Sequence, residues 1–103
     1  MNENLTHENF SQNLNTKFLL HYGGQSPMEL ELIEITQLKR APRQEMFSIR
    51  FRGPLDPQLL QRTFSLEHER MGAFELFLVA INRDEDGMYY EAVFNWLKEK
   101  EKA

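Results

Sequence analysis

The chain of 103 residues contains no cysteine. It can therefore form no disulfide framework, no thiolate nucleophile and no cysteine-based metal site. Proteins of reducing compartments lack disulfides, so this composition favours a cytoplasmic location. The fold must rest on a hydrophobic core, and 41% hydrophobic residues with eight phenylalanines are enough to build one.

Long apolar runs are also missing from the sequence. No stretch approaches the roughly 20 apolar residues that a membrane-spanning helix needs. The first ten residues, MNENLTHENF, lack a basic region followed by an apolar run, so we expect no secretory signal. We therefore expect no membrane partner.

Basic residues are fewer than acidic ones, 12 against 16, so the formal net charge is −4 and the pI is near 5.4. A domain that binds nucleic acid usually carries the opposite balance. The stacking aromatic motifs of RRM domains and the glycine-rich loops that bind phosphate are absent too. We therefore expect no nucleic-acid partner.

Residue types that perform catalysis or bind metals show no recognisable spacing. The three histidines are His7, His21 and His68. None lies at the HxH or HxxxH spacing of metal sites, and there is no GxSxG serine motif. Asp84-x-Asp86-Gly87 resembles a fragment of a calcium loop without the later ligands, so a hairpin turn explains it better. We expect no catalytic residue, no cofactor and no metal.

What the sequence does contain is an apolar period of two. Phe47, Ile49 and Phe51 alternate with polar residues, and so do Phe64 and Leu66. Side chains of a strand point alternately to its two faces, so this pattern predicts a sheet with one buried side. The expected strands are 16–22, 28–38, 45–52, 61–68, 73–82 and 88–97, with a polar loop at 39–44. Short links between six antiparallel strands are typical of a small barrel.

A short helix is expected before the strands, over about residues 7–13. Thr6 is a good N-cap, and Leu5, Phe10 and Leu14 can form one apolar stripe. The predicted fold class is therefore mainly β: a small antiparallel six-stranded barrel-like domain with a short N-terminal helix. It should be one domain over residues 1–103, with an ordered core at about 5–98 and a frayed tail at 99–103.

The second predicted strand changes phase within its length. Leu30 and Leu32 share one parity, whereas Ile33 and Ile35 share the other. One extra residue near Leu32 and Ile33 would keep all four side chains facing inward. The pattern therefore predicts a β-bulge at this point.

The strand at 73–82 is apolar on both faces. Phe77, Val79 and Ile81 occupy the face opposite to Phe74. A barrel of one layer buries only its inner face, so the outer one needs cover from the N-terminal helix, the C-terminal tail or another subunit. Phe77, Val79 and Ile81 are therefore our first candidates for a protein contact.

Arginines supply a second set of contact candidates, namely Arg40, Arg43, Arg50 and Arg52. Together with Lys39 they could form one basic face, since the loop continues directly into the strand that carries the last two. Such a face could meet phosphate or an acidic partner. Cross-strand pairing of Arg50 and Arg52 with Glu29, Glu31, Thr63, Glu67 or Glu69 explains these two equally well.

Four segments of the chain follow one another in the order MELELIEI, FSIRFRGP, QRTFSLEHERMGAFELFLVAI and YEAVFN. In order and spacing they resemble a family of small uncharacterised bacterial β-domain proteins with the patterns F-S-L-x-F-x-G-P, Q-x-x-Y-x-L-x-H, G-x-x-x-L-F-L-x-P and Y-x-A-x-F-N. The residues at these places are Phe47, Ser48, Phe51, Gly53, Pro54, Gln61, Phe64, Leu66, His68, Gly72, Leu76, Phe77, Leu78, Tyr90, Ala92, Phe94 and Asn95. Phe64 and Ala80 replace the usual tyrosine and proline. The resemblance implies no activity, but it implies an association with phage-tail-like genes.

These observations favour a non-enzymatic module that acts through protein–protein contact. It would be a small structural or accessory component, of a phage-tail-like assembly on the resemblance, and its partner would be another protein or a second copy of itself. The alternative is a binding module for a small molecule or peptide in the barrel mouth, around Tyr22, His68 and Trp96. An enzyme is the third hypothesis.

Overall fold

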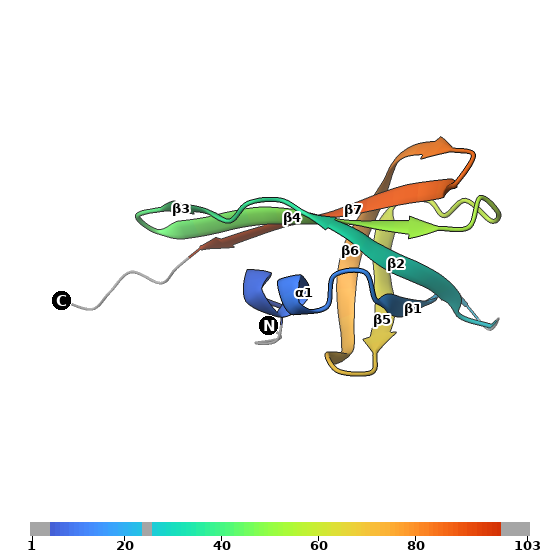
Figure 1. Cartoon of the computed structure of the whole chain (residues 1–103), viewed down its shortest axis with the longest axis horizontal. Coiled ribbons are helices and arrows are strands. Elements are labelled where there is room, and N and C mark those ends of the chain that lie inside the picture. The colour runs from blue at the N-terminus through green and yellow to red at the C-terminus, as the bar shows by residue number, and fades with distance from the viewer. Residues whose placement is uncertain (1–4, 24–25, 98–103) are drawn as a thin grey trace.

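One short helix and one sheet of seven strands make up residues 5–23 and 26–97, the part of the chain that the computed structural model describes (Figure 1). In chain order the elements are α1 (His7–Gln12), β1 (Lys17–His21), β2 (Met28–Ile35), β3 (Lys39–Ala41), β4 (Gln44–Gly53), β5 (Arg62–His68), β6 (Gly72–Asp84) and β7 (Gly87–Leu97). The predicted mainly β class is confirmed. The loop predicted at 39–44 is wrong in part, because β3 pairs there with β4.

Six of the strands close into an antiparallel barrel. Around the barrel the order is β1, β2, β4, β7, β6 and β5, and β5 pairs with β1 to complete the ring. Closure satisfies the backbone groups of the paired segments without leaving an edge. The predicted six-stranded barrel is therefore confirmed, and β3 lies outside the ring as an extension of the β4 edge.

The β-bulge predicted in β2 is present. The pairing of β2 with β4 shifts between Leu32 and Glu34, so Ile33 is an extra residue. Leu32 is buried, Ile33 is half-buried and Glu34 is exposed. Ile35 packs against the core, as predicted, but Ile33 lines a surface hollow beside Arg50 and Ile81, so the predicted inward direction of Ile33 is wrong.

The barrel interior is filled by alternate side chains of its strands. In β5, buried and exposed residues alternate from Thr63 to His68. The most deeply buried side chains, each at most 1% exposed, are Phe10, Phe18, Leu20, Leu30, Leu32, Ile49, Phe51, Leu66, Leu78 and Tyr90. Full burial of one such side chain contributes about 1.5–3 kcal/mol, so this core supplies most of the driving force for folding.

The helix α1 packs onto the core at one end of the barrel. Its N-cap is Thr6, as predicted, and the Thr6 hydroxyl oxygen accepts a hydrogen bond of 3.1 Å from the Asn9 backbone N–H. The Phe10 ring lies 6.4 Å from the Phe18 ring and 5.4 Å from the Phe94 ring, centroid to centroid. This single fully buried side chain therefore anchors the helix to strands on two sides of the barrel.

The end of α1 differs from the prediction. The helix stops at Gln12, and Asn13 is buried in place of Leu14, which is 38% exposed. The Asn13 side-chain N–H donates to the Asn9 carbonyl at 2.7 Å, and its amide oxygen accepts from the Arg70 guanidinium at 2.8 Å. A polar side chain can be buried here because both of its ends are bonded.

The strands β6 and β7 separate part of the way along their length. β6 pairs with β5 over residues 72–78 and with β7 only from Val79 onward, where Val79 lies opposite Glu91. β7 keeps its pairing with β4 from Met88 to Leu97. In Figure 1 the β5–β6 pair consequently runs away from the β4–β7 pair, and α1 lies between them. Together β3, β4 and β7 form an arm that projects beyond the barrel, and the longest dimension of the molecule is 51 Å.

The connection between β4 and β5 closes the other end of the core. Residues 54–61 of this connection form neither helix nor strand. Leu59 is buried there, and its backbone N–H donates to the Tyr90 hydroxyl at 3.0 Å. The predicted frayed tail at 99–103 lies outside the described residues.

Candidate interaction surface

The outer apolar surface consists of Phe77, Val79 and Ile81 on β6 and Val93 on β7. Phe77 is 52% exposed, Ile81 37% and Val93 70%, while Val79 is half-buried. All four face away from the core, because their neighbours in sequence supply the inward side chains of the same strands. Neighbouring large apolar side chains that remain in contact with water are typical of interaction sites.

The helix does not cover this surface. Phe10, its buried anchor, contacts inward-facing rings such as Phe74 and Phe94, so α1 lies on the core side of the sheet. The sequence left three elements that could cover this surface: the N-terminal helix, the C-terminal tail or another subunit. The prediction that the helix covers it is therefore wrong. The C-terminal tail lies outside the described residues, and another subunit is not part of the structure.

A hollow of about 350 Å³ opens where β6 and β7 separate. Buried side chains of Leu5, Leu76 and Phe94 line it, together with the exposed Phe77 and Val93. The hollow therefore joins the outer apolar surface to the edge of the core. Its lining can accept an apolar side chain from another molecule.

The pairing of β7 with β6 ends where Val79 lies opposite Glu91. Beyond that point β7 continues beside β4 as far as Leu97, while β6 pairs with β5. The hollow therefore lies where β6 and β7 separate.

The candidates Arg50 and Arg52 are engaged in ion pairs on the outer face of β4. Arg52 contacts Glu31 of β2 at 2.8 Å, and this hydrogen-bonded carboxylate raises the pKa of Arg52. Arg50 contacts both Glu34 of β2 and Glu91 of β7 at 3.4 Å. The sequence left open whether these arginines form a contact face or pair with residues of neighbouring strands, and cross-strand pairing is what the structure shows. Glu31 was among the predicted partners, whereas Glu34 and Glu91 were not.

Arg40 and Arg43 lie elsewhere, at the tip of the arm. Arg40 is on β3 and contacts Glu45 of β4 at 3.1 Å. Arg43 is exposed in the turn between these strands and makes no ion pair with the described residues. The four arginines therefore do not form one continuous basic face. They form a neutralised row on the barrel and a separate cationic tip.

The three residues proposed for a site in the barrel mouth do not come together. Tyr22 follows the last residue of β1, whereas His68 lies beside the first half of that strand, next to Phe18. Trp96 belongs to the arm, where its backbone pairs with Glu45, and its side chain is not among those described. The mouth site predicted from these residues is therefore wrong.

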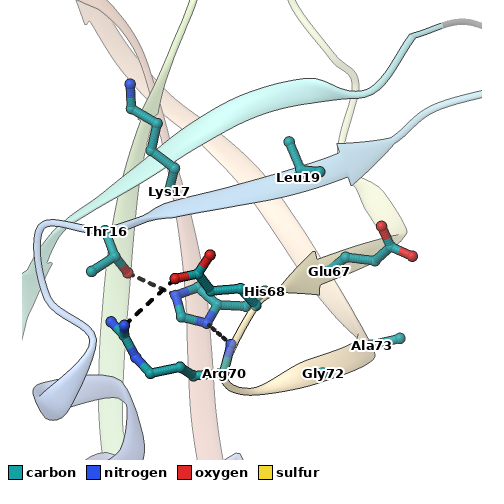
Figure 2. Close-up of a pocket in the computed structure, with 9 residues that line it drawn as sticks. Thr16, Lys17, Leu19, Glu67, His68, Arg70, Gly72 and Ala73 are labelled. Atoms are coloured by element: carbon teal, nitrogen blue, oxygen red, sulfur yellow. Dashed lines mark hydrogen bonds and ion pairs between the residues drawn. The ribbon is translucent and has the colours of Figure 1, made fainter.

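His68 is held in a complete hydrogen-bond network (Figure 2). Its Nδ1 accepts from the backbone N–H groups of Arg70 and Met71, at 3.0 and 3.2 Å. Nε2 therefore carries the proton and donates to the Thr16 hydroxyl oxygen at 2.8 Å, while that hydroxyl donates to the Asn13 carbonyl at 2.6 Å. Burial, and secondly the positive charge of Arg70, lower the pKa of His68.

This network ties three parts of the chain together: the end of α1, the start of β1 and the β5–β6 turn. Protonation of Nδ1 would oppose its two backbone donors, so the neutral ring is the form that fits. His68 therefore has a structural role, as a satisfied buried histidine.

The surface depression beside this network, about 590 Å³, carries charges of both signs. Lys17 and Arg70 line it together with Glu67 and Glu69. The Arg70 guanidinium lies 3.7 Å from the Glu69 carboxylate, and Figure 2 shows Arg70 beside His68. Among the described residues, no group of three or more His, Asp or Glu side chains is arranged to hold a metal ion. Every buried side-chain N or O atom among the described residues is hydrogen-bonded, so no buried polar atom is left in the depression without a partner.

Sequence reasoning missed two features of the surface. Val93 was not among the predicted contact residues, although its alternation with the inward Ala92 and Phe94 was a usable signal. The separation of β6 from β7 left no sequence signal, because it depends on which segments pair in the closed barrel.

Among the described residues there is no helix that is long and apolar enough to span a membrane.

Comparison with known proteins identifies a family but no relative of known activity. Residues 5–94 match the family described as domain of unknown function DUF6916. The match covers well over half of the chain, so the chain belongs to this family. No curated protein and no solved structure matches the chain.

Proposed function

We propose that this member of the DUF6916 family acts without catalysis, by binding another protein through its outer apolar surface. One observation carries the proposal: Phe77 and Val93 are 52% and 70% exposed on either side of a hollow that reaches the core. Exposed apolar side chains that surround a concave site are characteristic of protein contacts.

The gain from covering this surface is substantial. Full burial of one such side chain contributes about 1.5–3 kcal/mol, and Phe77 and Val93 still have half or more of their area to bury. Glu75 and Glu91 also line the hollow, which suits a partner with an apolar side chain flanked by a basic one. The fold already satisfies its buried polar groups, so this surface is not needed to complete it.

The cationic tip of the arm supports a second contact. Lys39 and Arg43 are exposed there and make no ion pair with the described residues. Unpaired cations at a projecting end suit an acidic partner surface and would act mainly on the rate of association. We propose Arg43 as this second contact, together with Arg40, whose side chain is 67% exposed despite its ion pair with Glu45. Arg50 and Arg52 would contribute less to binding, because carboxylates of the same chain already neutralise them.

The cellular setting is also a proposal. The lack of cysteine supports a reducing compartment, and we propose the cytoplasm. The resemblance to proteins associated with phage-tail-like genes supports a role as a small structural or accessory component of such an assembly. The genes that neighbour this one would test that role.

Site-specific photocrosslinking tests the proposed contact. A photoreactive residue at position 93, on the outer apolar surface, should give a discrete crosslinked product in the cells that naturally make the protein. The matched control is position 65, because Ser65 is also exposed on the outer face of a strand. Equal yields from the two positions, or no product from position 93, would refute contact through this surface.

A further inference from the structure

The two surfaces proposed above for contact with a partner carry opposite charges. Glu75 is exposed beside Phe77 at the hollow and has no ion-pair partner among the described residues. Glu91 also lines the hollow, but Arg50 lies 3.4 Å from its carboxylate. Among the described residues of the lining there is no lysine or arginine. The hollow therefore offers apolar side chains together with one carboxylate that no described cation neutralises.

The tip of the arm is a narrow turn of two residues, Pro42 and Arg43, between β3 and β4. Ala41 pairs with Gln44 directly behind the turn, so these two residues are the outermost part of the hairpin. Both are exposed, and Arg43 has no ion-pair partner among the described residues. An apolar ring beside a guanidinium is the combination that suits an apolar hollow with a carboxylate at its rim.

We propose, building on the function proposed above, that copies of this chain associate head to tail, with the arm tip of one copy in the hollow of the next. Pro42 would contact Phe77 and Val93 of the neighbouring copy. Arg43 would form an ion pair with Glu75 of that same copy. One contact would thus cover exposed apolar side chains and neutralise a charge on each side.

The tip cannot make this contact within its own chain. β4 and β7 stay paired as far as Gln44 and Leu97, which holds the arm extended, and Figure 1 shows it projecting from the barrel. From Gln44 to Arg50, which pairs with Glu91 where β6 leaves β7, the strand advances about 20 Å at roughly 3.3 Å per residue. Glu75 lies on the part of β6 that has left β7 and pairs with β5. The contact must therefore join two copies.

A second acidic site is the turn between β6 and β7, where Asp84, Glu85 and Asp86 are exposed. Charge alone would attract the cationic tip to either site. That turn includes no apolar side chain, whereas Phe77 and Val93 at the hollow are 52% and 70% exposed. The hollow is the favoured site, because only there does the contact also remove apolar area from water.

A contact between two different surfaces does not stop at two copies. A pair of copies still has one unused tip and one unused hollow. Such an assembly grows into a ring if the rotation between copies closes, and into a filament if it does not. We therefore expect the average mass in solution to rise past that of a dimer as concentration increases, and to fall with added salt, which screens exposed charges.

Sedimentation of the purified chain over a range of concentrations tests the inference. Arg43→Glu and Glu75→Arg should each weaken self-association about tenfold or more, because like charges then face each other. An equal mixture of the two variants should restore association, because the acidic tip of one variant fits the basic rim of the other. The second contact in that mixture is the one that the unmodified chain makes. Restored association also shows that both variants are folded.

The matched control is Glu85→Arg, which reverses a carboxylate that is also exposed, at the second acidic site. It should leave self-association unchanged, and it should fail to restore association when mixed with Arg43→Glu. Restoration by Glu85→Arg in place of Glu75→Arg would overturn the inference and place the tip on the turn between β6 and β7.

Two further outcomes overturn the inference. A chain that stays monomeric at every concentration does not associate with itself. A mixture of Arg43→Glu and Glu75→Arg that fails to restore the association of the unmodified chain excludes the proposed ion pair. In both cases, crosslinking from position 93 to a different protein would leave the proposed function standing, whereas the absence of any crosslinked product would refute that function separately.

Discussion

At the α1 end of the barrel, polar and apolar groups alike are covered and bonded, whereas along β6 and β7 large apolar side chains remain in water. Phe10 and Phe18 are fully buried, and His68 has a partner for both ring nitrogens. Across the sheet, Phe77 is 52% exposed and Val93 70%. The two regions thus differ in how completely one sheet is covered, and the proposed protein contact would account for the exposed one.

Packing explains how the two regions arise from one sheet. β1, β4, β6 and β7 each bring one inward phenylalanine ring against Phe10 of α1, which lies between the β5–β6 and β4–β7 pairs in Figure 1. The outward side chains of the same strands then have no layer above them in the described part of the chain. A sheet with only one covered face ordinarily places polar residues on the other face. β5 does so, whereas the middle of β6 carries Phe77, Val79 and Ile81 on that face.

The largest expected effect separates the covered region from the exposed one. Phe18→Ala removes a ring that contacts Phe10, Phe51 and Phe74, and it should cost about 3–5 kcal/mol of unfolding free energy. Phe77→Ala removes a ring of the same size and should cost about 1 kcal/mol or less, because half of that ring is already in water. Urea unfolding of the two variants measures both values. Similar losses would mean that Phe77 supports the fold.

A smaller effect concerns pH and the closed region. The lowered pKa of His68 means that the unfolded chain takes up this proton at higher pH than the folded chain. The contribution of His68 to stability should therefore be complete above about pH 6.5 and decrease as pH falls from there through the lower folded pKa. Thermal unfolding across this range measures the loss, and His68→Gln should reduce it.

The hydrogen bonds of His68 provide the control for that experiment. His68→Gln should also cost about 1–3 kcal/mol at neutral pH, because buried partners lose their bonds. Thr16→Val removes the two hydrogen bonds that the Thr16 hydroxyl makes in the same network, without removing the titrating ring. It should lower stability but keep the loss in acid, and an unchanged acid response in His68→Gln would show that other groups cause it.

The arginine row should contribute still less. Arg50 bridges Glu34 and Glu91 at 3.4 Å, and all three side chains are at least partly in contact with water. Exposed ion pairs are worth about 0.2–1 kcal/mol, so Arg50→Ala should shift the unfolding free energy by no more than that. A loss as large as that of Phe18→Ala would mean that the row holds the barrel closed.

The sequence predicted the regular parts of this fold well. Alternation in β4 and β5 located their buried faces, the phase shift in β2 located the bulge at Ile33, and Thr6 was identified as the N-cap of α1. Each of these features depends on neighbours within a few residues. Local patterns are therefore sufficient to find them.

The parts that the sequence could not predict depend on long-range pairing. β3 forms because β4 extends past the barrel and offers it an edge, and its residues Lys39 and Arg40 have no strand pattern. The apolar excess on β6 did indicate the exposed Phe77. The hollow beside it follows from where β6 leaves β7, and the burial of Asn13 follows from the position of Arg70 in a distant turn.

The smallest expected effect on stability should accompany the largest effect on binding. Val93 is 70% exposed, so Val93→Glu should change the unfolding free energy by about 0.5 kcal/mol or less. Burial of the new carboxylate against a partner would be costly, so the same change should disrupt the contact.

The most direct test is the yield of protein crosslinks from a photoreactive residue at position 77, measured with and without Val93→Glu. Phe77 lies across the hollow from Val93, so it reports on the same contact without carrying the mutation. The account predicts that the yield falls sharply in Val93→Glu while the melting temperature stays the same. An unchanged yield, or a yield that falls only together with the melting temperature, would contradict the claim that this surface binds a protein.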